Sequence, residues 1–400
     1  MPNPSSPTRH IKPALASRHS RKAGIVGAGL MGRLLALQLL DHGWQVTLFD
    51  QDDISGTQSC AYTGAGMLSP ISELETAEPI ITQLGLASIP LWEHWISRFQ
   101  WPVFLQKAGT LVVAHPLDTS DLKHFRDNLQ AKIQQYKLTE LLENNQIQWH
   151  LNQNDLDQLE PQINARFATG IYIPNEGQID NRQLLPCLAQ TLIQSGVAWY
   201  FKHPVHKILP FMVKDQHETW HFDCVFDCRG LGAKKDLNNL RGVRGEIIRV
   251  YAPEVTLNRP IRLMHPRYPI YIVPRENHHF LIGATSIESE DFRPLTIQSA
   301  LELLSAAFTV HPGFSEASIL ENNVNCRPAL PDHLPCIQIT DGLIRINGLY
   351  RHGFLIAPKL AELVCQVLIQ TVQTEKLCLQ CPSLFQVNYN PEKQYDAVAR

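Results

Sequence analysis

The sequence predicts an α/β protein in which a Rossmann-like nucleotide-binding domain is interleaved with an α+β domain built on a largely antiparallel sheet. Three observations support this fold class. A strand, a glycine-rich turn, a helix and a second strand follow one another near the N-terminus. The alternation of strands and helices is later interrupted and resumed, and hairpin-like strands follow. A chain of 400 residues also exceeds what one compact core usually holds, so two structural regions are expected.

The composition is that of a globular enzyme. Hydrophobic residues make up 44% and charged residues 18%, which leaves little room for long disordered regions. The net charge of −3 gives no overall electrostatic footprint for nucleic acid, so no nucleic-acid partner is expected. The chain has no run of about 18 apolar residues and no secretory signal, so we expect a cytoplasmic protein without a membrane span. The sequence does not determine the oligomeric state, and a homo-oligomer is compatible with it.

The nine cysteines are odd in number and scattered, unlike a disulfide framework. Cys378 and Cys381 form a C-x-x-C pair, and Cys224 and Cys228 form a C-x-x-x-C pair. A structural zinc site needs four ligands, and neither pair is accompanied by a second pair or a paired histidine motif. We therefore expect reduced thiols and no metal site.

The N-terminal third begins with one compact βαβ unit. Residues 1–22 are rich in Pro, Ser and basic residues and predict a disordered extension. From Ala23, "AGIV" predicts a strand, "GAGLMG" a turn, "RLLALQLLDHG" a helix and "QVTLFD" a second strand. A helical pattern over 79–99, strands within 101–114 and a capped helix over 119–136 then break the alternation.

The remaining elements first resume the alternation and then depart from it. A helix, a strand and short β segments are predicted in turn at residues 181–194, 197–201 and 220–230. Largely antiparallel strands are predicted at residues 243–251, 268–275 and 279–286, with "RENHH" as a hairpin turn. The strand "GLIRI" and the helix "KLAELVCQVLIQ" return to the first domain.

These patterns predict a discontinuous division of the chain. The nucleotide-binding domain is assigned residues 23–80, 150–235 and 326–375. The second domain is assigned residues 81–149 and 236–325, and residues 376–400 are assigned to a C-terminal tail.

The first turn carries the spacing of a dinucleotide site. Gly27, Gly29 and Gly32 fall as G-x-G-x-x-G between a strand and a helix. Gly27 permits the tight turn, Gly29 lets the backbone approach a pyrophosphate, and Gly32 allows close packing of helix on strand. Asp50 ends the second strand, where a carboxylate would accept hydrogen bonds from a ribose hydroxyl. These features predict a dinucleotide site without separating NAD from FAD.

Two further glycine-rich turns favour FAD. "TGAGMLSP" follows the second strand, and "VFDCRGLGA" is a strand that runs into a second Gly-x-Gly turn containing Gly230. A bound FAD needs backbone contacts along its whole length, and several such turns can supply them.

The same turns, in order, carry a resemblance to a known family. "GAGLMG", "TGAGMLSP", "FDCRGLGA", "VRGE", "YIVPR" with "GATS", "CRPALPDHLP" and "GLYRHGFLIAPKLAE" resemble the FAD-dependent D-amino-acid oxidase-like family, and within it the glycine oxidases of thiamine biosynthesis. The match runs from about Ala23 to about Gln373. It implies an FAD-binding domain of the glutathione-reductase type and FAD as the cofactor.

The resemblance also implies which residues contact FAD. The turn after the first strand would hold the pyrophosphate, Asp50 the adenosine ribose, and Val205 the adenine side. The turn at 63–67 would line the isoalloxazine, and residues 353–355 would direct helix N–H groups at its C2 carbonyl, where reduced flavin carries negative charge. The implied cofactor residues are Gly27, Ala28, Gly29, Leu30, Met31, Gly32, Asp50, Thr63, Gly64, Ala65, Gly66, Met67, Val205, Gly230, Gly353, Phe354 and Leu355.

For the substrate, the resemblance implies Arg351, Arg327 and Tyr271. A planar guanidinium can hold a carboxylate through two parallel charge-assisted hydrogen bonds. Arg351 would be that anchor, or would share the role with Arg327 and the Tyr271 hydroxyl. Outside the family context an ordinary strand aromatic is the simpler interpretation of Tyr271, and a surface ion pair or phosphate contact that of Arg327. Arg351 is harder to explain in that way because it lies between two apolar runs.

The implied reaction is the oxidative deamination of glycine or a small amino acid or amine. Hydride would pass from Cα to flavin N5, giving an imine, with O2 or another acceptor reoxidising the flavin; O2 would give H2O2. In thiamine biosynthesis the imine goes to thiazole formation. Position and charge neutralisation suffice for this chemistry, so neither His352 nor His333 is predicted to be a catalytic base.

The sequence differs from the family pattern at two positions, so the identity of the substrate is not settled by the resemblance. Ser286 stands where the family can have an apolar methionine, and His352 where asparagine is common. Alternatives are a D-amino-acid, sarcosine or proline dehydrogenase or oxidase with another acceptor, a tRNA-modifying flavin oxidoreductase, and a flavin-binding protein without turnover.

Overall fold

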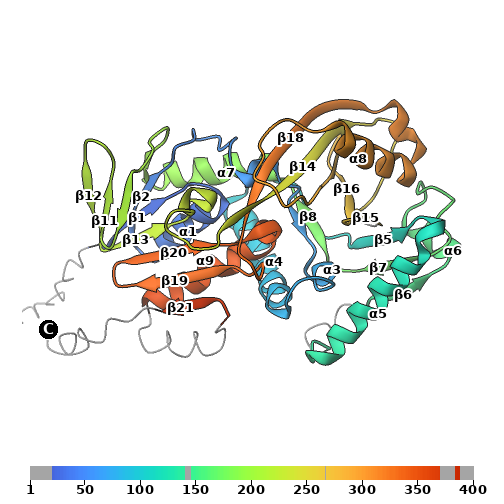
Figure 1. Cartoon of the computed structure of the whole chain (residues 1–400), viewed down its shortest axis with the longest axis horizontal. Coiled ribbons are helices and arrows are strands. Elements are labelled where there is room, and N and C mark those ends of the chain that lie inside the picture. The colour runs from blue at the N-terminus through green and yellow to red at the C-terminus, as the bar shows by residue number, and fades with distance from the viewer. Residues whose placement is uncertain (1–19, 140–145, 266, 370–382, 388–400) are drawn as a thin grey trace, which may run out of the picture.

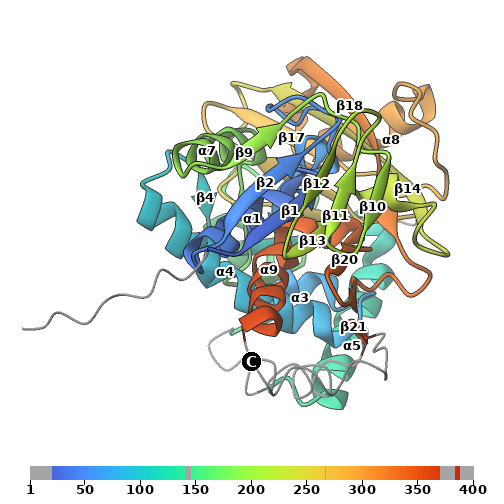
Figure 2. The same cartoon turned by 90° about the vertical axis from the view of Figure 1, so that its left-hand side faces the viewer.

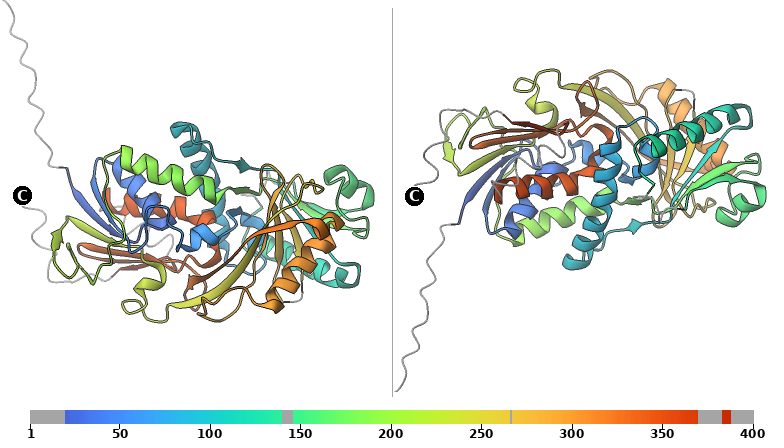
Figure 3. Two further views of the ribbon diagram at one scale, coloured as in Figure 1. Left: turned by 90° about the horizontal axis from the view of Figure 1, so that it is seen from above. Right: turned by 90° about the horizontal axis from the view of Figure 1, so that it is seen from below.

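The computed structural model describes residues 20–139, 146–265, 267–369 and 383–387. Two large sheets lie toward opposite ends of the elongated molecule (Figure 1). The views from above and below show the same division, with α9 beside α1 at one end and α8 at the other (Figure 3). Within the described ranges, no helix is both long and apolar enough to cross a membrane.

The first sheet is the predicted nucleotide-binding sheet. Seven strands of the described chain form it, in the order β21-β19-β20-β13-β1-β2-β9. All neighbouring pairs are parallel except β19 and β20. In chain order the strands are β1 (Lys22–Val26), β2 (Gln45–Phe49), β9 (Ala198–Tyr200), β13 (Cys224–Asp227), β19 (Cys336–Thr340), β20 (Leu343–Asn347) and β21 (Phe385–Val387).

Helices cover one face of this sheet, and a small β meander covers the other (Figure 2). The helices α1 and α9 pack against each other, and α4 packs on α9. Their apolar residues form the largest core cluster of the molecule. The helices are α1 (Leu30–Asp41), α4 (Pro79–Phe99), α7 (Asn181–Gln194) and α9 (Gly353–Ile369), and the meander is β10 (Lys207–Leu209), β11 (Met212–Lys214) and β12 (Thr219–His221).

The second sheet is largely antiparallel, as the sequence predicts. Its order is β18-β14-β17-β16-β15-β5-β7-β6, and β5 and β15 are its parallel pair among the described residues. The helices α8 (Ile297–Val310) and α5 (Thr119–Gln135) contribute to separate core clusters against it. The strands are β5 (Thr110–Ala114), β6 (Gln148–Leu151), β7 (Gly170–Ile173), β14 (Arg241–Tyr251), β15 (Ile261–Met264), β16 (Ile270–Pro274), β17 (His279–Gly283) and β18 (Ser318–Ala329).

Short elements connect the two ends. A small sheet joins β3 (Met67–Leu68), β8 (Gly177–Ile179) and β4 (Leu105–Gln106). The remaining helices of four or more α-helical residues in the described chain are α2 (Cys60–Thr63), α3 (Pro70–Glu73) and α6 (Gln153–Leu159). The helix α3 ends at Glu73. The side chain of Glu73 lines the cavity described below.

Several predicted elements are confirmed. The helices over 79–99, 119–136 and 181–194 appear as α4, α5 and α7. The predicted hairpin "RENHH" joins β16 to β17, with positive φ at Asn277 and His278. Two consecutive positive φ angles match the twist that an antiparallel two-residue turn requires.

The two ends of the chain differ from the prediction. Residues 1–19 lie outside the described residues, but β1 begins at Lys22, inside the predicted extension. The predicted tail contains β21, which pairs in parallel with β19. Leu384 and Phe385 are buried, so a short apolar segment adds an edge strand to the sheet.

The domain boundaries stay a prediction. The strand β7 falls in the segment assigned to the nucleotide-binding domain, and β6 crosses the predicted boundary at residue 150, but both strands belong to the second sheet. The helix α8 is absent from the predicted elements, although Leu303, Ala306, Ala307 and Val310 have helical spacing.

Candidate active site

A cavity of about 860 Å³ opens at the carboxyl ends of β1 and β2 and extends to β14, β16 and β18. Crevices at the carboxyl ends of parallel strands are where open α/β sheets bind ligands. All the predicted site residues line this cavity except Gly32 and Leu355. The fold therefore brings together residues that lie more than three hundred positions apart in the sequence.

The β1–α1 turn has the geometry that the glycine spacing predicts. Gly27 has φ +96°, and a Cβ there would lie 2.6 Å from the backbone of Cys228. A Cβ at Gly29 would meet nothing within 4 Å, so this position leaves open space. A Cβ at Gly32 would lie 2.0 Å from the Gly27 carbonyl oxygen. Gly32 thus packs the helix on the turn and does not line the cavity, whereas Gly27, Gly29 and the N-terminus of α1 form a cradle for phosphates.

Asp50 links the cradle to the end of β2. Its carboxylate accepts hydrogen bonds from the Ala28 N–H and, at 2.8 Å, from the Asp52 N–H. Burial raises the pKa of Asp50, against the effect of these two hydrogen bonds. The Asp50 carbonyl accepts from the His203 N–H at 2.7 Å, which places the 203–205 segment, with Val205, at the same end of the cavity.

The turn at 63–67 forms another wall. Gly66 has φ +62°, and a Cβ there would lie 2.0 Å from the Ile179 carbonyl oxygen. Arg275 Nη2 donates to the carbonyl oxygens of Ala65 at 2.6 Å and Ile179 at 3.2 Å. This close approach needs glycine at position 66, and all five residues of the turn line the cavity.

The N-terminus of α9 faces the cavity through Gly353 and Phe354. Leu355 is buried, and its side chain lies next to Gly85, so it does not line the cavity. Pro358 is the sixth residue of this helix, which begins at Gly353. A proline cannot donate to the carbonyl four positions earlier. Trp92 Nε1 donates to that carbonyl, of Phe354, at 2.9 Å.

The three residues predicted to hold a carboxylate differ in how they are paired. The Tyr271 hydroxyl is buried without a hydrogen-bond partner among the described residues, and burial raises the pKa of Tyr271 to about 12. Arg327 Nη1 donates to the Thr285 carbonyl at 3.1 Å and the Arg244 carbonyl at 3.4 Å. Arg351 donates from Nε to Glu73 at 2.7 Å and from Nη2 to Thr76 at 2.6 Å.

The sequence does not predict Glu73 as a site residue. Burial acts to raise the pKa of Glu73, but its charged and hydrogen-bonding neighbours, Arg351 first, outweigh burial and lower that pKa overall. Glu73 lines the cavity, so its carboxylate balances the arginine charge there. No local motif marks it, because its partner Arg351 lies 278 positions away.

Tyr350 and Ser286 form a second unpredicted contact in the cavity wall. The Tyr350 ring stacks on His333, with ring centroids 4.5 Å apart. The Tyr350 and Ser286 hydroxyl oxygens lie 3.1 Å apart. Tyr350 lies within the motif "GLYRHGFLIAPKLAE", but the sequence predicts no role for it. His333 acts here as a stacking partner for Tyr350.

The described residues contain no group of three or more His, Cys, Asp or Glu side chains arranged to hold a metal ion. Cys224 and Cys228 are buried free thiols. Cys378 and Cys381 lie outside the described residues.

The burial of His352 leads us to expect a measurable pH dependence of the free energy of unfolding. Its side chain is 3% exposed, with Nδ1 3.4 Å from Glu73. Burial lowers the pKa of His352 to about 4, with Arg351, His333 and Arg327 acting in the same direction and Glu73 opposing. Between pH 6.5 and 4 the unfolded chain therefore binds a proton that the folded chain excludes. Acidification through this window should lower the free energy of unfolding by up to about 3 kcal/mol.

The variant His352→Asn should remove this contribution. Urea unfolding of both proteins at several pH values measures it as the difference between the two stability profiles. Parallel profiles would show that His352 does not stay neutral in the folded protein.

Comparison with known proteins agrees with this geometry. Residues 22–367 match the family model described as DAO, FAD dependent oxidoreductase. The chain is 37% identical to a Rhizobium etli oxidoreductase named for thiamine biosynthesis, ThiO, over 88% of this chain and 97% of that one. It is 26% identical to the glycine oxidase of Geobacillus kaustophilus over 87% of this chain and 93% of that one. The crystal structure of that glycine oxidase superposes with a TM-score of 0.73 at 24% identity, covering 87% and 94% of the two chains. The chain belongs to the DAO family of FAD-dependent oxidoreductases.

Proposed function

We propose that this protein oxidises glycine, or another small amino acid or amine, to its imine, and that the imine serves thiazole formation in thiamine biosynthesis. One observation carries the proposal: Arg327 and the unpaired hydroxyl of Tyr271 line the same cavity as the glycine cradle and the N-terminus of α9. A carboxylate-bearing amine could therefore be held beside a dinucleotide cofactor. The relatives named for thiamine biosynthesis and for glycine oxidation support the choice of substrate.

The residues present fit FAD. Gly29 and Gly353 both leave open space where a side chain would project, and Asp50 and Val205 line the cavity. We propose that Gly27, Ala28, Gly29, Leu30 and Met31 hold the pyrophosphate. The other proposed cofactor contacts are Asp50, Thr63, Gly64, Ala65, Gly66, Met67, Val205, Gly230, Gly353 and Phe354. When bound, FAD supplies the acceptor for the hydride that leaves the substrate Cα.

The protein contributes position and charge. Arg327 would bind the carboxylate, and the Tyr271 hydroxyl, whose raised pKa keeps it protonated, would donate a hydrogen bond to it. Arg351 adds positive charge, but its Nε and Nη2 are already engaged by Glu73 and Thr76. The N-terminus of α9 favours negative charge at its end of the cavity. His352 does not line the cavity, which agrees with a reaction that needs no histidine base.

Peroxide production tests the proposal. With O2 as acceptor, glycine, O2 and water would give glyoxylate, ammonia and H2O2. The FAD-loaded protein should release H2O2 with glycine when it is assayed against sarcosine, D-alanine and L-proline. Turnover of L-proline with a quinone and none of glycine would instead identify a dehydrogenase of another amine.

Tyr271→Phe should separate stability from activity. Leaving a buried hydroxyl unpaired costs about 1 kcal/mol or more, so its removal should raise the free energy of unfolding of the substrate-free protein. The same change should raise KM for glycine about fivefold to tenfold, because one hydrogen bond to the carboxylate is lost. Denaturant unfolding and steady-state kinetics measure the two effects. A lower stability together with an unchanged KM would show that Tyr271 has a packing role.

A further inference from the structure

The motif "VRGE", Val243 to Glu246, lies in the first half of β14, and the proposed function assigns it no role. In a strand, side chains alternate between the two faces of the sheet. Gly245 and Ile247 line the cavity, whereas Arg244 and Glu246, at the alternate positions, are buried and do not line it. One face of this short motif therefore lines the site, and the other lies away from it.

Gly245 provides the space that the Arg327 guanidinium occupies. β18 runs antiparallel to β14, with Arg327 opposite Val243, so Gly245 is its diagonal neighbour on the same face. A Cβ on Gly245 would lie 2.3 Å from Arg327 Nη2 and 2.5 Å from Nη1. Any side chain at 245 would displace the guanidinium.

Two carbonyl oxygens hold the guanidinium in this space, those of Arg244 and Thr285. Thr285 is fixed to Glu246 in three ways. Its N–H donates to the Glu246 carbonyl at 3.2 Å, and its hydroxyl donates to Glu246 Oε2 at 2.9 Å. The same hydroxyl accepts from the Glu246 N–H at 2.9 Å.

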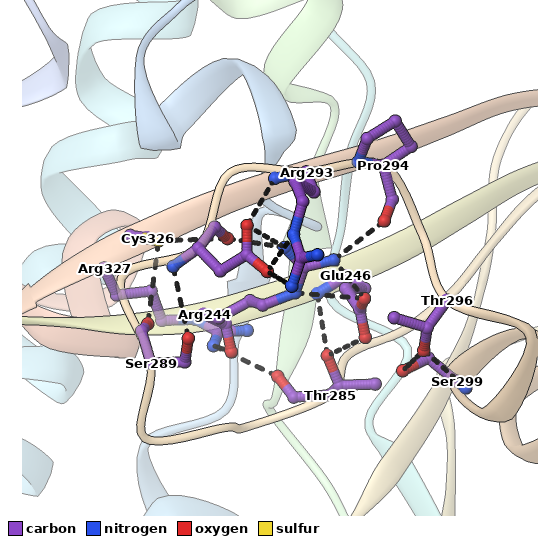
Figure 4. A network of polar contacts seen from close by, with 11 residues as sticks. Arg244, Glu246, Thr285, Ser289, Arg293, Pro294, Thr296, Ser299, Cys326 and Arg327 are labelled. Carbon is purple, nitrogen blue, oxygen red and sulfur yellow. Dashed lines mark hydrogen bonds and ion pairs between the residues drawn. The ribbon is translucent and has the colours of Figure 1, made fainter.

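Arg244 completes the network on the far face. Its Nη2 and Nε donate to Glu246 Oε1 at 2.6 and 3.1 Å. It also donates to the carbonyl oxygens of Asp291 and Pro294. Both side chains are buried, at 3% and 0% exposure, so the pair forms a rigid support for Thr285. Figure 4 shows these contacts around Arg244, Glu246 and Thr285.

We propose that the VRGE motif positions Arg327 for substrate carboxylate binding: Gly245 provides its space, Arg244 supplies one of the two carbonyl groups that orient it, and the Arg244–Glu246 pair fixes Thr285, which supplies the other. These residues act through Arg327 and are positioning residues. The inference rests on the proposed function, in which Arg327 binds the carboxylate.

Gly245→Ala tests the space directly. The atoms it would meet are the far end of a flexible side chain, so the fold should survive while the guanidinium moves. Gly242→Ala, in the same strand, is the matched control, because its nearest contact is Glu290 Cγ and not Arg327. The readout is the dissociation constant of acetate, measured by perturbation of the flavin spectrum, with uncharged acetamide as the isosteric comparison.

Gly245→Ala should weaken acetate binding about tenfold or more, the equivalent of losing a charge-assisted hydrogen bond. Acetamide binding, FAD affinity and Tm should stay as in the wild type, and Gly242→Ala should bind acetate normally. In an Arg327→Met background, Gly245→Ala should cause no further loss, because the residue it positions is gone.

A second pair of variants tests the network. Thr285→Val removes the hydroxyl that Glu246 holds and should weaken acetate binding, whereas Thr285→Ser should restore it. Wild-type acetate affinity in both Gly245→Ala and Thr285→Val, with Arg327→Met impaired, would overturn the inference. If Gly245→Ala weakened acetate binding equally in the wild-type and the Arg327→Met backgrounds, the inference would also be overturned. If Arg327→Met itself binds acetate normally, the proposed function fails at its carboxylate anchor, which is a distinguishable result.

Discussion

Replacing Arg327 with methionine is expected to lower kcat/KM for glycine by about a hundredfold, while FAD remains bound. Removing one partner of a desolvated charge pair costs about 2–5 kcal/mol, and about 3 kcal/mol corresponds to a hundredfold. Arg327 lines the cavity with the outer part of its guanidinium free of protein carboxylates in the described structure. Arg351, by contrast, is already paired with Glu73. Steady-state kinetics of the FAD-loaded variant measure the loss.

Arg293→Met is the control for Arg327→Met, because it removes an arginine that lies outside the cavity lining. Its side chain is 86% exposed and pairs with Asp291 at the surface, so kcat/KM should stay near the wild-type value. A loss of less than threefold in Arg327→Met would contradict its role as the main carboxylate anchor.

Replacing Gly29 with leucine is expected to weaken FAD binding strongly and leave the protein folded. Gly29 has φ −67°, which leucine adopts without strain. A Cβ there meets no protein atom within 4 Å, so the added side chain would project into the space where a pyrophosphate would approach the helix N-terminus. The FAD dissociation constant should rise by about a hundredfold or more, since several backbone hydrogen bonds to phosphate would be blocked.

FAD titration followed by flavin fluorescence measures this affinity, and far-ultraviolet circular dichroism checks the fold. Gly29→Ala should give an intermediate loss, because the affinity should follow the size of the side chain. A folded Gly29→Leu protein that binds FAD normally would place the cofactor elsewhere.

The sequence could predict the parts of the site that depend on local geometry. The roles of Gly27, Gly29 and Gly32 follow from their spacing between a strand and a helix, and the structure has the corresponding φ angle, open space and close contact. The hairpin at 275–279 was also predictable, since both strands alternate and a short polar segment joins them. Such features depend on residues that are close together in the sequence, so a local pattern is enough to predict them.

The features that the sequence could not predict depend on long-range contacts. The pairing of Glu73 with Arg351 joins a four-residue helix to the segment before α9. Contacts to Glu73 and Thr76 occupy two of the donor atoms of Arg351, which is why we propose Arg327 as the main carboxylate anchor. The strand β21 becomes recognisable when β19 is known to offer it an edge. The position of Arg327 over Gly245 depends on the register between β14 and β18, which no local pattern specifies.

The central claim is that this cavity holds FAD and presents an amino acid to it. Anaerobic mixing of the FAD-loaded protein with glycine, followed by flavin absorbance, tests this claim most directly. We predict rapid bleaching of the flavin in the wild type and slow bleaching in Arg327→Met at the same glycine concentration. A protein that binds FAD but shows no bleaching with glycine, sarcosine, D-alanine or L-proline would contradict the account.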